Sequence, residues 1–78
     1  MSNTEKYSKI FTDLFDITPD QTAGLKYQGI PAWDSVGHMQ LVAALEEAFD
    51  IMLETDDIID LSSYEAGKEI LKKYDVEF

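Results

Sequence analysis

The chain contains no cysteine, so disulfide bonds and thiolate metal sites are both excluded. A single histidine, His38, leaves too few nitrogen ligands for an ordinary zinc site. No apolar run approaches the ~20 residues that span a membrane, and the polar start, MSNTEK, is not typical of a signal peptide. We therefore expect a soluble, cytoplasmic protein that does not insert into membranes.

Basic residues are also scarce, because 6 Lys and Arg stand against 16 Asp and Glu, a formal net charge of −10. Nucleic acids and anionic membrane surfaces carry the same sign, so we do not expect them as partners. Neither Lys nor Arg occurs between Lys26 and Lys68, although acidic residues continue through that span. Such a surface either keeps a small protein soluble or attracts basic partners.

The length of 78 residues predicts one domain, residues 1–78, and an apolar content of 45% is normal for a folded domain. The chain begins close to its first predicted helix and ends soon after its last. We therefore expect a freestanding protein with no linker to a larger synthase. We also expect it to be a monomer.

Apolar residues recur at helical spacing, and no alternating pattern is long enough to predict a strand. The first predicted helix is capped by Asn3 or Thr4 and is stopped by Thr18-Pro19. Its apolar positions are Tyr7, Ile10, Phe11, Leu14 and Phe15. Residues 18–33 then form a long loop without periodicity. We expect that loop to be attached to the core by Leu25, Ile30 and Trp33.

The second predicted helix runs from Ser35 to Phe49 with Asp34 as its N-cap, and Trp33 stands where a hydrophobic staple would. Its broad apolar stripe comprises Met39, Leu41, Val42, Ala44, Leu45, Ala48 and Phe49.

Two further helices complete the prediction. A short third helix is capped by Thr55, with Asp56 and Asp57 at its positive end and Ile58, Ile59 and Leu61 as anchors. The fourth begins with a capping box of Ser62 and Glu65. Its inward residues are Tyr64, Ala66, Ile70, Leu71 and Tyr74. The predicted fold is thus all-α: three main helices and one short helix, with a long loop between the first two.

Ser35 and His38 lie three residues apart, so a helix would make them neighbours, as nucleophilic catalysis requires. No oxyanion hole or nucleophile-elbow pattern accompanies them, so we expect no catalytic activity and a half-exposed His38. The acidic run from Glu54 to Asp60 lacks the calcium-loop pattern. It indicates a solvated helix face, with loose divalent binding as the alternative.

Ser35 itself has two interpretations. It either simply starts the helix or serves as an attachment point for another group. The first turn of a helix has unpaired N–H groups and favours an anion. A phosphate ester on the Ser35 hydroxyl would therefore lie at the positive end of the helix.

The segment WDSVGHMQLVAALEEAFD, residues 33–50, resembles the second helix of acyl carrier proteins. In that family Asp-Ser-Leu is followed by a Leu-Val…Ala-Leu-Glu-Glu-x-Phe pattern, and Val36 here replaces the leucine. The resemblance extends through the acidic third helix, residues 56–61, to the Ser-Ser-Tyr start of the fourth, residues 62–64.

The resemblance implies an acyl-carrier-like bundle in which Ser35 bears 4′-phosphopantetheine, added by a phosphopantetheinyl transferase. The distal thiol of this arm would carry acyl groups as thioesters, which supplies a thiol to a chain without cysteine. Asp34 matches the family residue that helps to engage the transferase and its magnesium. The other partners implied are an acyl- or aminoacyl-loading ligase and downstream transferases or synthases. The residues expected at partner contacts are Val36, Met39, Ala43, Glu46, Glu47, Asp56 and Asp57.

Some residues depart from the family pattern. Gly37 and Gln40 stand where fatty-acid carriers usually have acidic residues, and Ala43 replaces a bulkier residue. The Asp-Ser-x-Gly sequence resembles carriers that serve D-alanine transfer and other specialised pathways. The alternatives are therefore a carrier for fatty-acid, polyketide or specialised biosynthesis, an aminoacyl or D-alanyl carrier, or an acidic helical interaction module without a prosthetic group.

Overall fold

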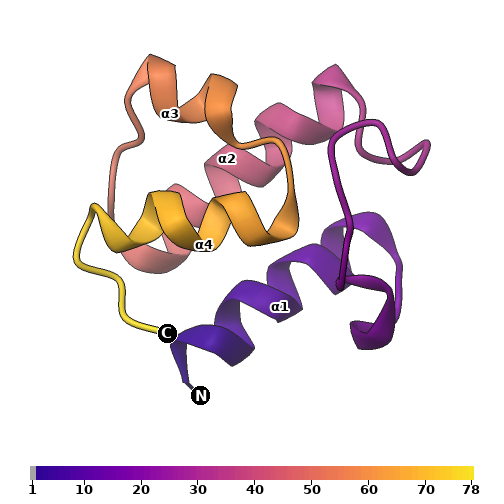
Figure 1. Ribbon diagram of the computed structural model, residues 1–78, viewed down its shortest axis with the longest axis horizontal. Coiled ribbons are helices and arrows are strands. Elements are labelled where there is room, and N and C mark those ends of the chain that lie inside the picture. Colours follow the sequence, from indigo (N-terminus) through magenta and orange to yellow (C-terminus); the bar gives the residue numbers. More distant parts are fainter. Residues whose placement is uncertain (1) are drawn as a thin grey trace.

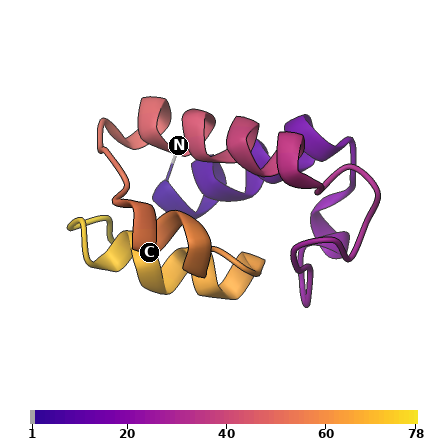
Figure 2. The same cartoon turned by 90° about the horizontal axis from the view of Figure 1, so that it is seen from above.

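The computed structural model describes residues 2–78 as a small bundle of four α-helices in two layers. The elements are α1 (Asn3–Phe15), the 3-10 turn η1 (Pro19–Gln21), α2 (Ser35–Phe49), α3 (Thr55–Asp60) and α4 (Tyr64–Lys72). α1 lies beside α2 in one layer, and α3 lies beside α4 in the other (Figure 2). The long loop between α1 and α2 covers one end of the bundle (Figure 1). The prediction of three main helices and one short helix is confirmed.

The helix starts differ by one or two residues from the predicted caps. Ser2 caps α1 in a capping box with Glu5, in place of Asn3 or Thr4. Glu54, not Thr55, precedes α3. At α4 the Ser63 hydroxyl accepts from the Ala66 amide at 3.0 Å, so the predicted box of Ser62 and Glu65 is wrong.

Ser62 is unsuited to that cap because its backbone is used elsewhere. Its carbonyl accepts a hydrogen bond from the Tyr27 amide at 2.8 Å, and the Tyr64 amide donates to the Leu25 carbonyl at 2.8 Å. These two bonds flank an isolated antiparallel bridge between Lys26 and Ser63. The chain therefore enters α4 one residue later than the capping-box pattern predicts.

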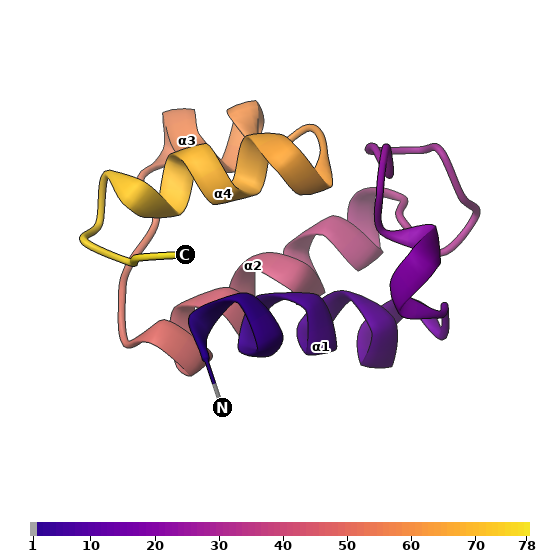
Figure 3. The ribbon, with the colours of Figure 1, turned by 60° about the horizontal axis from the view of Figure 1, so that its bottom comes forward.

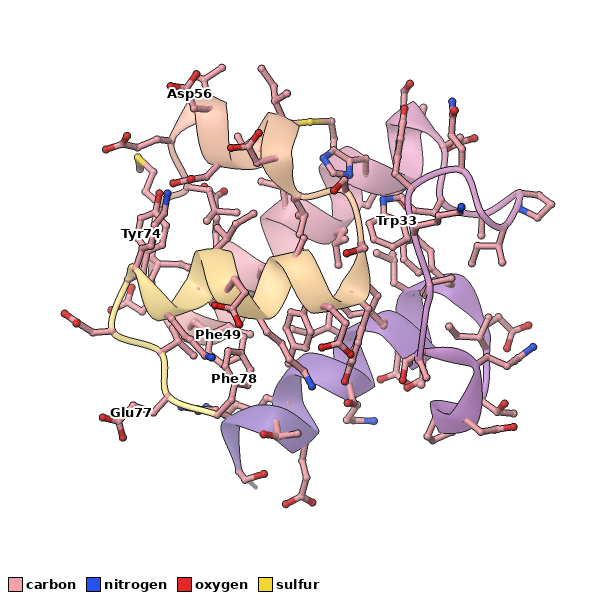
Figure 4. The ribbon with its side chains drawn as sticks, in the orientation of Figure 1. Trp33, Phe49, Asp56, Tyr74, Glu77 and Phe78 are labelled. Carbon is pink, nitrogen blue, oxygen red and sulfur yellow. The ribbon has the colours of Figure 1, made fainter. Side chains whose placement is uncertain are left out.

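An aromatic cluster fills the core between α1, the long loop and α4. Phe11 lies edge-on to Trp33 with ring centroids 5.5 Å apart, and Phe15 stacks on Trp33 at 5.4 Å. The Tyr7 hydroxyl donates to the Tyr64 carbonyl at 2.6 Å. Trp33 points from the loop into the molecule (Figure 4), so the predicted anchoring of the loop by this residue is confirmed. The buried apolar residues are Tyr7, Phe11, Phe15, Leu25, Trp33, Leu41, Val42, Leu45, Leu53, Leu61, Tyr64, Ile70, Leu71 and Val76.

Several residues expected inside lie nearer the surface. Met39 and Ile59 are exposed, and Phe49 is only half-buried. Adjacent helix positions point in different directions, so a short helix such as α3 cannot bury both of its isoleucines against one neighbour. Tyr74 lies beyond the end of α4, since that helix stops at Lys72. Among residues 2–78, no helix has the length and apolar character needed to cross a membrane.

Candidate functional site

Ser35 is the first residue of α2 and is exposed to solvent. The preceding residue caps the helix as predicted, because the Asp34 carboxylate accepts from the Gly37 amide at 2.8 Å. On its other side, the Ser35 Oγ lies 3.1 Å from the hydroxyl of Tyr27. The serine hydroxyl is thus accessible at the end of the helix where backbone N–H groups point outward.

Tyr27 is a site residue that sequence reasoning missed. It belongs to the irregular loop, eight positions before Ser35, and no local pattern connects the two. Its position comes from the bridge between Lys26 and Ser63, which fastens the loop to the start of α4. Its ring also lies edge-on to His38, with centroids 5.2 Å apart. The contact with Ser35 therefore depends on tertiary pairing.

Gly37 allows the chain that leads into α2 to lie directly against the first turn of that helix. A Cβ atom at this position would lie 2.1 Å from the Ala32 carbonyl oxygen, closer than any real contact. The glycine that appears in the sequence as a departure from the fatty-acid carrier pattern thus has a packing role here.

His38 connects three parts of the molecule. The Trp33 indole N–H donates to His38 Nδ1 at 3.0 Å, and His38 Nε2 lies 2.8 Å from the Ile58 carbonyl oxygen. Indole nitrogen only donates and a carbonyl only accepts, so the proton of the neutral ring is on Nε2. The Trp33 and His38 rings also stack, with planes 15° apart. Trp33 therefore holds the staple position, but its partner is a histidine whose two nitrogens are both engaged.

A pocket of about 260 Å³ lies between the N-terminal part of α2 and the C-terminal end of α3. It opens to solvent and is lined by Tyr27, His38, Ile58, Ile59, Leu61 and Ser62. Because Tyr27 contacts Ser35 and also lines the pocket, a group attached to the serine would begin beside the pocket entrance.

Four predicted contact residues form one stripe along α2. Val36 and Met39 expose 67% and 55% of their surface, and Ala43 and Glu47 are also exposed. These positions recur every three or four residues and so share one helix face. The stripe begins next to Ser35. Asp56 on α3 is exposed too and points away from the body of the molecule (Figure 4).

The other two predicted contact residues have internal partners. The half-buried Glu46 carboxylate accepts from the Leu53 amide at 2.9 Å. Asp57 is only 4% exposed, so its predicted place on a solvated acidic face is wrong. It accepts hydrogen bonds from Lys73 and Tyr74, because the packing of α3 on α4 turns this residue inward. Those hydrogen bonds, from Lys73 first and Tyr74 second, hold the pKa of Asp57 below its ordinary value.

No group of three His, Asp or Glu side chains within residues 2–78 is arranged to hold a metal ion. Comparison of the chain with protein-family models, with curated proteins and with solved structures finds no match. The chemistry of the site therefore follows from its residues and their geometry.

Proposed function

We propose that this protein carries acyl intermediates as thioesters on a 4′-phosphopantetheine arm attached to Ser35. The observation that carries the proposal is the exposed Ser35 hydroxyl at the first turn of α2, directly after the capping Asp34. The sequence around it, residues 33–50, resembles the second helix of acyl carrier proteins. Exposure matters because a transferase must reach this oxygen.

The chemistry of attachment suits the residues present. Ser35 Oγ would bond to the pantetheine-bearing phosphorus of coenzyme A and lose its proton, while the pyrophosphate bond breaks and adenosine bisphosphate leaves. The resulting phosphodiester is an anion at the positive end of a 15-residue helix, which is a favourable position. The Tyr27 hydroxyl, 3.1 Å from Oγ, is placed to donate a hydrogen bond to a phosphate oxygen.

The surroundings of Ser35 suit contact with partner enzymes. The apolar residues Val36 and Met39 offer a small exposed surface beside the attachment point. Glu47 and Asp56 are exposed acids on α2 and α3, and they would attract basic surfaces of a transferase, a loading ligase or a downstream synthase. Tethering would raise the effective concentration of the intermediate at each enzyme.

Modification by a phosphopantetheinyl transferase tests this function. The protein is incubated with the transferase and coenzyme A, and its intact mass is measured. We expect the wild type to gain one phosphopantetheine and Ser35→Ala to gain none. Ser62→Ala is the matched control, since it removes another exposed serine near the same pocket and should still be modified.

The alternative is an acidic interaction module without a prosthetic group. If the wild type gains no mass while an established carrier protein in the same reaction does, the carrier proposal is wrong and this alternative is favoured.

A further inference from the structure

We propose, building on the carrier function above, that His38 restricts this protein to short acyl cargo by fastening α3 to α2, and that the lining of the adjacent pocket favours uncharged cargo. His38 is then a positioning residue that sets cargo length. The cargo itself would lie in the pocket beside Ser35 rather than inside the bundle.

The hydrogen bond from His38 to the Ile58 carbonyl is the structural basis of this role. Among residues 2–78 it is the one hydrogen bond that joins α2 to α3. His38 is itself held by the Trp33 indole, and Trp33 is fully buried. Two consecutive hydrogen bonds therefore connect the buried Trp33, through His38, to the C-terminal half of α3.

The opposite end of α3 is held by different contacts. Asp57, in its first turn, accepts hydrogen bonds from Lys73 and Tyr74, which follow α4. Figure 4 places Tyr74 at the other end of the molecule from Trp33. With one end fastened to α2 and the other to the end of α4, α3 is restrained from moving away to admit a long chain.

The interior behind the pocket is already filled. Trp33, Leu41, Leu45 and Leu61 are fully buried, and Leu61 also lines the pocket. A long acyl chain would have to displace these side chains from close packing, which is unfavourable. The space that remains is the open pocket of about 260 Å³.

The pocket volume sets the expected cargo length. A cavity of about 150 Å³ holds one benzene molecule, which has six carbon atoms, so 260 Å³ has room for about ten such atoms. The thioester end of the arm would take part of that space. We therefore expect room for an acyl chain of about six carbons or fewer.

The lining also favours uncharged cargo. Its polar groups belong to Tyr27, His38 and Ser62, and no carboxylate lines the pocket. The ammonium group of an aminoacyl thioester would lose water there without gaining an ionic partner, which is costly. The structure thus favours acyl over aminoacyl cargo.

The test loads the full-length protein from acyl-coenzyme A compounds with a transferase that accepts them, and it compares melting temperatures with the unacylated holo form. Butyryl, hexanoyl, decanoyl and hexadecanoyl groups test the effect of chain length. Propionyl and alanyl groups, which are similar in size, test the effect of the positive charge on the alanyl group. The proteins are the wild type, His38→Ala and Gln40→Ala, which changes an exposed residue of the same helix.

In the wild type we expect the melting temperature to rise by a few degrees for each methylene removed from water up to hexanoyl, and to stay level beyond it. In His38→Ala the rise should continue to decanoyl, and Gln40→Ala should match the wild type. Propionyl should stabilise more than alanyl.

Three results overturn the inference: a wild-type rise that continues to hexadecanoyl, a His38→Ala profile identical to the wild type, or stabilisation by alanyl equal to or above that by propionyl. Should His38→Ala fail to fold, His38→Leu, which keeps bulk but cannot donate to the Ile58 carbonyl, replaces it with the same expected result. The wild-type series still decides the length limit. Failure of any loading at Ser35 contradicts the carrier function itself, so the two failures are distinguishable.

Discussion

The two sides of the bundle are built differently. Where α4 faces α1, aromatic rings interlock, with Tyr7 and Tyr64 at 4.9 Å and Phe11 and Tyr64 at 5.1 Å between centroids. Where α3 faces α2, the described residues provide one hydrogen bond and a pocket open to solvent. Figure 3 shows α3 and α4 above the layer of α1 and α2. Aromatic packing thus joins α4 to α1, whereas a pocket separates α3 from the start of α2 next to Ser35.

The largest expected effect tests whether the aromatic packing between α1 and α4 is the main source of the free energy of unfolding. Phe11→Ala should destabilise the fold by about 3–5 kcal/mol, because the ring is fully buried among aromatic neighbours. Phe49→Ala, which removes a half-buried ring, should cost only about 1–2 kcal/mol. Chemical denaturation of both variants measures the difference. Equal losses would show that the aromatic cluster is not the main source of stability.

A smaller effect is expected where Ala32, at the end of the long loop, contacts the first turn of α2. Gly37→Ala introduces a methyl group against the Ala32 carbonyl, at a cost of about 1–3 kcal/mol, offset by about 1 kcal/mol of helix propensity. We expect chemical denaturation to show a net loss of stability. Gln40→Ala, exposed on the same helix, should stay within about 0.5 kcal/mol of the wild type. A stabilised Gly37→Ala would contradict the close approach.

The smallest effect is expected at Asp57, where the exposed ammonium of Lys73 keeps water close to the ion pair. Because the pKa of Asp57 is lowered on folding, its carboxylate stabilises the folded state above the unfolded pKa of about 3.9. That contribution is lost as the pH falls through the lower, folded pKa.

Thermal unfolding between pH 7 and pH 2 measures this contribution. Asp57→Asn should melt below the wild type at pH 7, and the gap should narrow below about pH 4. Asp56→Asn, its exposed neighbour, should show no such pH-dependent gap. If the difference in melting temperature between Asp57→Asn and the wild type does not depend on pH, Asp57 stabilises the fold through packing and not through its charge.

The helices of this protein were predictable because local patterns encode them. The apolar spacing of Tyr7, Phe11 and Phe15 placed α1, and Asp34 followed by the stripe of α2 placed both ends of that helix. The caps of α1, α3 and α4 were predicted less accurately, because a cap depends on backbone conformation and on competing hydrogen bonds, as at Ser62.

The position of Ser35, the proposed attachment residue, was also predictable from sequence, because Asp34 before it is a favourable N-cap. Its surroundings were not. Tyr27 reaches Ser35 only through the pairing of the loop with the start of α4, and Asp57 turns inward only because α3 packs on α4. The periodicity of apolar residues in a sequence does not predict contacts between residues so far apart in the chain.

Composition and contacts within a few residues fix the all-helical class, the negative net charge and the serine at a helix start. The arrangement of the helices in space brings His38 to α3 and buries Asp57 against the residues that follow α4. The physical reason is that hydrogen bonding and close packing between distant segments depend on how the helices are arranged in space, which no local pattern specifies.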